Sequence, residues 1–318
     1  MKKLARVLFI SDVHGSTPVF TKALGAAAAY KAETLVHGGD IIGKYITPFF
    51  HTDGAVETEI MGAKRPLKNE GEIRAAEAEV SRIGSYAYHT TQDQWRELRA
   101  KPEAMTDVFF KLANERLASW VRLAEEKLKP LGIKLFLNIG NDDFQDLGKT
   151  IEVSNYVVYP NNKVLLLDDD HEMLSLGNTN ITPWKCEGDM EEPDLQRTLD
   201  VLASKVQHPE RALFNLHCPP VDTKLDVAPL LDPELRPVYL PGGEPQMVHV
   251  GCKAVRALLQ RVQPMAGLHG HIHESRGYEK IGRTMCFNPG SEYTIGVLSS
   301  LLLNLSRDKV ESFMFLSA

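Results

Sequence analysis

Short apolar segments alternate with amphipathic ones in the first forty residues of this 318-residue chain. Ala5–Ile10 (ARVLFI) is a continuous apolar run typical of a buried strand, and Thr34–His37 is a second one. Between them, Thr17 before Pro18 is typical of a helix start, and apolar residues continue at helical spacing to about Tyr30. The pattern predicts a β–α–β unit with polar residues gathered at the strand ends.

The segment 44–130 departs from this pattern, because its apolar residues follow helical spacing over long stretches. Unstructured loops of this length are rare in compact domains. We therefore predict a mainly helical insertion, either a cap or an oligomerisation element, within a single domain spanning 1–318. Two helical faces support the prediction: Ile73, Ala76, Val80, Ile83 and Ala87, then Met105, Val108, Phe109, Leu112, Ala113, Leu117, Trp120, Val121, Ala124 and Leu128.

After the insertion, short apolar runs and helical spacing alternate again. This alternation is typical of an α/β fold. The expected helices cover 195–206 and 252–262. The expected strands cover 133–138, 153–158, 163–167, 212–216, 265–268, 284–288, 296–304 and 310–316.

Composition narrows the class of protein. Hydrophobic residues make up 43% and charged residues 25%, which is typical of a globular chain. The formal net charge of −6 argues against nucleic acid as a partner, because such binding needs a basic surface. The apolar start, interrupted at Arg6, is too short for a signal peptide, and no apolar run is long enough to span a membrane. Four widely spaced cysteines fit reduced thiols, so we expect a cytoplasmic protein without a membrane partner.

Potential metal ligands follow each central strand. In α/β sheets, sites gather beyond the carboxyl ends of the strands, and residues two apart in extended backbone point the same way. Any one of these residues alone would fit a turn or a buried histidine, whereas the ordered set indicates a metal site. The predicted ligands are Asp12, His14, Asp40, Asn141, His217, His271 and His273. Nitrogen and oxygen donors without cysteine favour Mn, Fe, Co, Ni or Zn over Mg or Ca.

The order of these motifs resembles that of the calcineurin-like metallophosphoesterases, in their bacterial and archaeal form. The resemblance runs from Arg6 to about Gly296, skips the insertion, and includes GHIHES at Gly270–Ser275 with NPGSE at 288–292. It implies a two-sheet α/β/β/α sandwich with a dinuclear metal centre. It also implies that one divalent ion takes Asp12, His14, His273 and Asp40, and that the other takes Asp40, Asn141, His217 and His271.

One position departs from the pattern of these relatives. Many of them carry a histidine directly after the motif asparagine, where this chain has Asp142. An ionised carboxylate repels a phosphate dianion and donates no proton, so Asp142 could act as a general acid only with a raised pKa. Arg276, just after the metal histidines, is a second catalytic candidate, because it could contact a phosphate oxygen.

These features predict a metal-dependent phosphoesterase in which a hydroxide bridging two metal ions attacks phosphorus. The expected substrate is a small phosphoester or nucleotide, with diesters favoured over unactivated monoesters because of Asp142. Three alternatives stay open: a catalytically silent scaffold of the same fold, a nuclease subunit and a phosphoprotein phosphatase. The apolar helical faces of the insertion also predict a homo-oligomer if they are not covered within the chain.

Overall fold

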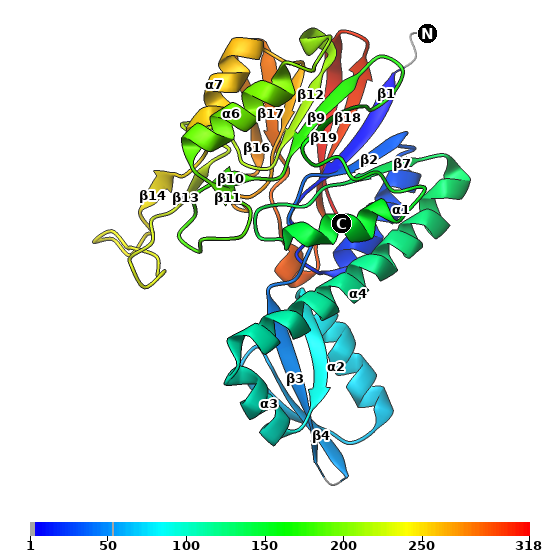
Figure 1. Ribbon diagram of the computed structural model, residues 1–318, viewed down its shortest axis with the longest axis vertical. Coiled ribbons are helices and arrows are strands. Elements are labelled where there is room, and N and C mark those ends of the chain that lie inside the picture. Colours follow the sequence, from blue (N-terminus) through cyan, green and yellow to red (C-terminus); the bar gives the residue numbers. More distant parts are fainter. Residues whose placement is uncertain (1–3, 53) are drawn as a thin grey trace.

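Two mixed sheets form the body of the protein, whose computed structural model describes residues 4–52 and 54–318 (Figure 1). The first sheet has the order β19-β18-β1-β2-β7, and the second has the order β16-β17-β15-β12-β9-β8. The strands of the first are β1 (Ala5–Ile10), β2 (Thr34–His37), β7 (Lys134–Leu137), β18 (Ser299–Ser306) and β19 (Lys309–Ser317). Those of the second are β8 (Lys163–Leu166), β9 (Glu172–Leu176), β12 (Leu213–Leu216), β15 (Ala266–Leu268), β16 (Gly277–Ile281) and β17 (Thr284–Asn288).

The alternating side chains of the central strands build two layers of core. In β1, Val7 and Phe9 pack into the cluster between the sheets, and Leu8 and Ile10 pack beneath helices. The helices α1 (Thr17–Ala29), α4 (Pro102–Leu128) and α5 (Gly148–Glu152) cover the first sheet. The helices α6 (Glu192–Ala203) and α7 (Lys253–Val262) cover the second. The predicted two-sheet α/β/β/α sandwich is therefore confirmed.

Within each sheet the central strands are parallel. β1 pairs with β2 and β2 with β7, while β12 lies between β9 and β15. The carboxyl ends of parallel strands meet at one edge, so the loops after them converge. The antiparallel strands β18 and β16 lie toward the outside of this arrangement.

The insertion contains more than helices. Alongside α2 (Glu70–Arg82), α3 (Gln92–Arg99) and α4 it holds a four-stranded sheet, which the sequence analysis missed. Its strands, in the order β5-β4-β3-β6, are β3 (Tyr45–Thr52), β4 (Ala55–Ile60), β5 (Ala63–Leu67) and β6 (Ser85–Thr90). Figure 1 shows β3, β4, α2 and α3 as a lobe that projects from the body of the protein. This lobe has its own small core around Phe49, Ile60 and Val80.

A predicted strand at 153–158 is wrong. The segment follows α5 and turns, because the Ser154 hydroxyl accepts hydrogen bonds from the backbone N–H groups of Tyr156 and Val157. Only Val158 makes a sheet-like bridge, to Phe136. Two strands of the second sheet, β9 and β16, were missed in turn.

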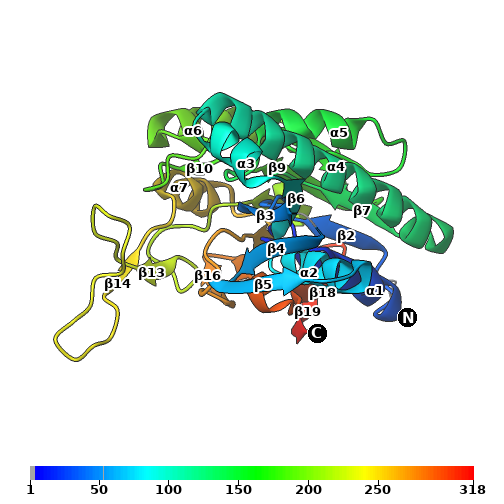
Figure 2. The ribbon, with the colours of Figure 1, turned by 90° about the horizontal axis from the view of Figure 1, so that it is seen from below.

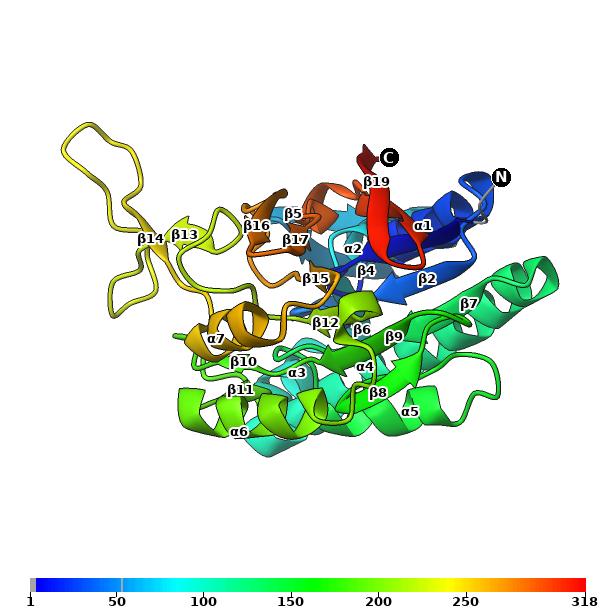
Figure 3. The same cartoon turned by 90° about the horizontal axis from the view of Figure 1, so that it is seen from above.

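A two-stranded arm extends beyond the second sheet. β13 (Val227–Pro229) pairs with β14 (Met247–His249), and the chain between them forms long loops that project outward (Figures 2 and 3). A further short pair, β10 (Thr179–Asn180) and β11 (Asp189–Met190), lies between β9 and α6 in sequence.

None of the helices described in the structure is long and apolar enough to cross a membrane.

The long helix α4 joins the lobe to the body of the protein. Its Trp120 is 2% exposed, stacks on Phe20 of α1 with ring centroids 4.4 Å apart, and donates through Nε1 to the Thr17 hydroxyl at 3.2 Å. The C-terminal part of the insertion is therefore also part of the main core.

We expect Trp120→Ala to lower the free energy of unfolding by about 3–5 kcal/mol, because it leaves a large cavity between α1 and α4. Urea denaturation followed by circular dichroism measures the loss. Trp184→Ala is the matched control, since Trp184 is 61% exposed and its removal should change stability little. Equal stabilities for the two variants would contradict the packing of α4 into the core.

Candidate metal centre

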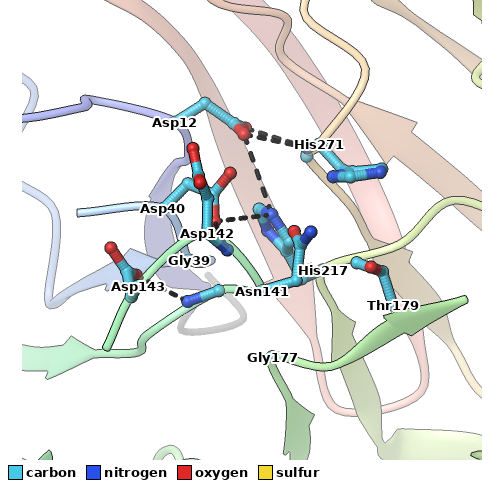
Figure 4. Close-up of polar contacts among 12 residues, drawn as sticks. Asp12, Gly39, Asp40, Asn141, Asp142, Asp143, Gly177, Thr179, His217 and His271 are labelled. Carbon is cyan, nitrogen blue, oxygen red and sulfur yellow. Dashed lines mark hydrogen bonds and ion pairs between the residues drawn. The ribbon is translucent and has the colours of Figure 1, made fainter. Parts of the chain in front are cut away.

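Five loops from the two sheets bring the seven predicted ligands together, and Figure 4 shows Asp12, Asp40, Asn141, His217 and His271 of this set. Three loops follow strands of the first sheet and two follow strands of the second. The cluster contains Asp12 and His14 after β1, Asp40 after β2, Asn141 after β7, His217 after β12, and His271 and His273 after β15. All except His271 and His273 are buried, and these two are partly exposed.

Unusual backbone conformations turn several of these side chains inward. Asp12, His14, Asp40 and His271 have φ between 39° and 67° although none is glycine. A residue other than glycine in this left-handed region costs about 1–3 kcal/mol, and such positions cluster at functional sites. Four of the eleven non-glycine residues with positive φ in the described part of the chain thus lie at this cluster.

Glycines allow the loops to approach closely. A Cβ on Gly39 would lie 2.6 Å from the His217 Nδ1 atom, and one on Gly140 would lie 2.1 Å from the Asp40 Oδ1 atom. No side chain fits at either position without moving a member of the cluster. The two glycines before Asp40 and Asn141 are therefore required by packing at the site.

The two oxygens of Asp40 face different histidines. Its Oδ2 atom lies 3.6 Å from His14 Nε2, and its Oδ1 atom lies 3.3 Å from His217 Nε2. Asp12 Oδ1 lies 3.5 Å from His273 Nε2. Three groups of atoms are compact enough to hold an ion: Asp12 with His14 and His273, Asp40 with His217 and His271, and His14 with Asp40 and Asp142.

Several buried polar atoms of the cluster have no hydrogen-bond partner in the described part of the chain. They include the Asn141 Oδ1 atom and both ring nitrogens of His217. The Asn141 amide nitrogen is satisfied, because it donates to Asp189 Oδ1 at 2.9 Å, and this bond leaves the amide oxygen directed to the cluster. The Nε2 atoms of His14 and His273 lie only 3.1 Å apart. Buried nitrogen and oxygen atoms that converge without hydrogen-bond partners fit a site for a divalent metal ion, which needs the histidines in their neutral form.

The charges of the cluster favour a bound cation. Burial opposes ionisation of Asp12 and Asp40, but His217 keeps the pKa of both carboxyls well below their usual range. Burial also opposes a charge on His217, yet Asp40 and Asp12 raise its pKa to about 9. Burial lowers the pKa of His271 to about 4, which leaves a neutral ring able to ligate a metal. Asp12 and Asp40 thus stabilise a positive charge on His217, close to the position that a metal ion would take.

Asp143 ties two of the loops together beneath the cluster. Its buried carboxylate accepts hydrogen bonds from the backbone N–H groups of Ile41 at 2.9 Å, Ile42 at 2.8 Å and Gly140 at 2.7 Å. Burial and the nearby Asp40 raise the pKa of Asp143 to about 7, against the effect of these hydrogen bonds. The sequence analysis did not assign this residue a role in the site.

We expect Asp143→Ala to lower the free energy of unfolding by about 2–4 kcal/mol, because it leaves buried N–H donors unpaired. Metal affinity should fall about 10- to 100-fold, as when a group that orients a ligand is removed. Urea denaturation and titration with Mn²⁺ measure the two effects. Asp143→Asn keeps one acceptor oxygen and should be milder. Wild-type stability and affinity in Asp143→Ala would contradict this assignment.

Lys44 is a second residue of the site that sequence reasoning missed. Its Nζ atom lies 2.9 Å from Asp142 Oδ2, and each side chain is about one-third exposed, at 36% and 32%. The Cys186 thiol lies 3.6 Å from the other Asp142 oxygen. Burial and Asp40 raise the pKa of Asp142, although Lys44 opposes the shift. Its position four residues after Asp40 is the sequence feature that could have indicated a role in the site, but this spacing matches no metal-ligand motif.

The NPGSE segment supports the opposite side of the cluster. The Asn288 amide donates to the backbone oxygen of Ile272 at 2.9 Å, and the Ser291 hydroxyl donates to the backbone oxygen of Asp12 at 2.7 Å. Tyr293 then places its ring 4.8 Å from that of His14. This segment therefore holds the histidine and aspartate loops in register.

Arg276 lies apart from the cluster. Its guanidinium group donates to the Ser317 hydroxyl at 2.8 Å and lies over the Phe315 ring, both in β19. The predicted contact with a phosphate oxygen therefore has no support in the geometry. Of the two catalytic candidates, the structure brings only Asp142 to the metal-ligand residues.

Comparisons with known proteins support the fold. No protein-family model matches the sequence. An uncharacterised protein of Methanocaldococcus jannaschii is 26% identical over 118 residues, which cover 36% of this chain and 46% of that protein. One crystal structure matches with a TM-score of 0.56 and 15% identity over 99% of both chains. The crystal structure of TT1561 from Thermus thermophilus matches with a TM-score of 0.50 and 12% identity over 96% of this chain and 100% of that one. At these identities the likeness concerns the fold alone, and it agrees with the two-sheet α/β architecture described above.

Proposed function

We propose that this protein is a metal-dependent phosphoesterase that binds two divalent ions, drawn from Mn, Fe, Zn, Ni and Co. The observation that carries the proposal is the position of Asp40, whose two oxygens face His14 and His217 in separate groups of ligands. A carboxylate placed in this way can bridge two ions. Asp12, His14 and His273 would complete one site, and Asn141, His217 and His271 the other.

Two divalent ions would supply a deprotonated water as nucleophile and would polarise the phosphoryl oxygens. The residues of the chain provide the positions and the charge balance. Asp12 and Asp40 neutralise only part of the charge of two such ions, so the centre stays positive and attracts a phosphate ester. Asn141 and the histidines contribute no negative charge and therefore keep this attraction.

Lys44 and Asp142 support a preference for diesters and activated esters. Burial opposes the charge on Lys44, but Asp142 raises its pKa above the ordinary value, so the ammonium group is a weak proton donor. Asp142 shares this ion pair and adds negative charge beside Asp40. Burial and Asp40 raise the pKa of Asp142, but the ion pair with Lys44 favours its ionised form, so we propose that neither group protonates an alkoxide efficiently and that esters with good leaving groups react fastest.

We also propose that the insertion acts as a cap, not primarily as an oligomerisation element. It begins at Lys44, which contacts Asp142. Arg116 of α4 donates to the backbone oxygen of Gly15 at 2.8 Å and to that of Ser85 at 2.9 Å, which links the loop of His14 to the lobe. The insertion thus contributes one charged side chain to the site and braces one of its loops.

The test is an assay of chelated protein with Mn²⁺, Zn²⁺, Ni²⁺, Co²⁺ and Mg²⁺ on paired mono- and diesters. We expect hydrolysis of bis(p-nitrophenyl) phosphate to return with a transition metal and to exceed hydrolysis of glycerol phosphate. Metal analysis should find two ions per chain. Absence of metal-dependent hydrolysis with every ion would overturn the function, and faster hydrolysis of glycerol phosphate would overturn the diester preference.

A further inference from the structure

An apolar pocket adjoins the candidate metal centre. It has a volume of about 370 Å³, within the usual range for small-molecule sites. Its walls come from the loop after β10 and from both strands of the projecting arm. The side chains that matter here are Ile181, Trp184, Leu231, Val248, His271 and Ile272.

His271 belongs to both the pocket and the metal-ligand cluster. A phosphate group held at the cluster therefore has its organic substituent within reach of the pocket. Figure 4 shows the His271 ring on the side of the cluster away from Asp143. His271 thus lies between the pocket and the position expected for the reacting ester.

The polar side chains of the pocket already have partners. The Thr182 hydroxyl donates to Asp189 Oδ2 at 2.6 Å, and the Asn180 amide nitrogen donates to the backbone oxygen of Val250 at 3.2 Å. The Asn180 oxygen accepts from the Cys218 thiol at 3.0 Å. These side chains form hydrogen bonds within the pocket walls. The fit of an occupant therefore depends on its shape and on its apolar contacts.

The walls favour a flat ring. Trp184 is 61% exposed and Ile181 is 46% exposed although both line the pocket, so apolar area is available there. Pro183 and Pro229 add two rigid rings to the lining. Flat aromatic groups stack on such surfaces, and removal of one stacking side chain commonly weakens binding about 10-fold or more.

We infer that this pocket binds a flat aromatic substituent of the phosphoester substrate, an aryl group or a nucleobase, without reading its heteroatoms. The inference rests on the proposed function, because the cluster is taken to hold the phosphate. Trp184 is the principal contact. The identity of a nucleobase should then have little effect on binding. Asn180 and Thr182, which could distinguish one base from another, already form hydrogen bonds within the protein.

Competitive inhibition of bis(p-nitrophenyl) phosphate hydrolysis tests the inference. We expect phenylphosphonate to inhibit the wild type more strongly than methylphosphonate, and Trp184→Ala to reduce that ratio about 10-fold. Tyr239→Ala is the matched control, because Tyr239 lies on the same arm, is also 61% exposed and does not line the pocket. It should keep the wild-type ratio. Equal inhibition by the two phosphonates, or an unchanged ratio in Trp184→Ala, would overturn the inference.

A binding measurement separates this inference from the proposed function. Phenylphosphonate should quench tryptophan fluorescence in the wild type and not in Trp184→Phe, and methylphosphonate should quench neither. Quenching without hydrolysis under any metal would overturn the phosphoesterase proposal and leave the pocket supported. Hydrolysis without quenching would overturn the inference about the pocket and leave the phosphoesterase proposal supported. Adenosine, uridine and phenyl monophosphates should bind within a few-fold of one another, and a preference above about 10-fold would overturn the claim that heteroatoms are not read.

Discussion

Asp40→Asn should reduce diester hydrolysis by at least about 10²-fold and lower the metal content of the protein. Removing a residue that merely orients a metal ligand lowers metal affinity or activity about 10- to 100-fold. Removing a residue shared by two groups of ligands should therefore cause a larger loss. The Asp40 carboxylate faces His14 and His217 through different oxygens. Asparagine keeps the size of the side chain but replaces one oxygen and removes the charge. Elemental analysis and steady-state kinetics measure the two effects.

Asp168→Asn is the matched control for this variant. Asp168 accepts a hydrogen bond from His171 and lies between β8 and β9, at the opposite end of β9 from the cluster. The substitution removes a hydrogen-bonded carboxylate without touching the site, so metal content and turnover should stay at wild-type values. Two bound ions together with near-wild-type turnover in Asp40→Asn would rule out the bridging role.

The ligand cluster could be predicted because local sequence constrains it. Short apolar strands are readily recognised, and parallel strands deliver their carboxyl ends to one edge. Asp40 and Asn141 each follow a glycine, which the close approach of the loops requires. The order of these motifs predicted one cluster, whereas the grouping of His14 with His273, whose Nε2 atoms lie 3.1 Å apart, came from the resemblance to the metallophosphoesterases.

Lys44 and the pocket at Trp184 could not be predicted in the same way. Lys44 reaches Asp142 only because the insertion starts at the edge of the site, and a single lysine in a loop has no characteristic spacing. The pocket depends on how the arm folds over the loop after β10, a tertiary contact without local periodicity. Arg276 was predicted from its place after the metal histidines, whereas its side chain packs on β19, a tertiary contact that sequence spacing does not reveal.

The strands of the insertion were missed for a different reason. β4 (AVETEI) alternates buried Val56, Thr58 and Ile60 with more exposed residues, so period-two patterning was present. The stronger helical faces of α2 and α4 on either side dominated the interpretation. Short strands in a small lobe carry few apolar residues, because that lobe buries only a small core. Their signal is correspondingly weak.

Lys44→Met should lower kcat/KM for a diester about 10- to 100-fold. The Lys44 ammonium group lies 2.9 Å from the Asp142 carboxylate, and without it that carboxylate remains unpaired within 4.8 Å of the Asp40 carboxylate. Breaking a fully buried pair costs more, but each of these side chains is about one-third exposed and solvent screens part of the effect. The decrease should be larger for a dianionic monoester than for a monoanionic diester. Steady-state kinetics on both substrates measure it.

The Asp142→Asn substitution in the Lys44→Met background identifies the cause. If the loss comes from the unpaired carboxylate, the double variant should recover about 10-fold of the lost kcat/KM, and Asp142→Asn alone should change it little. Lys163→Met is the matched control, because Lys163 forms a comparable pair with Glu152 at 3.0 Å on the outer edge of the second sheet. It should leave the kinetics unchanged.

The outcome of this cycle separates two roles for Lys44. Recovery in the double variant would show that Lys44 acts by neutralising Asp142, which explains how a carboxylate can occupy a position close to the phosphate. Equal losses in the single and double variants would instead place the Lys44 ammonium group directly on the substrate and contradict the neutralising role. Wild-type kinetics in Lys44→Met would show that the insertion contributes no charge to catalysis, and would remove the basis for its role as a cap.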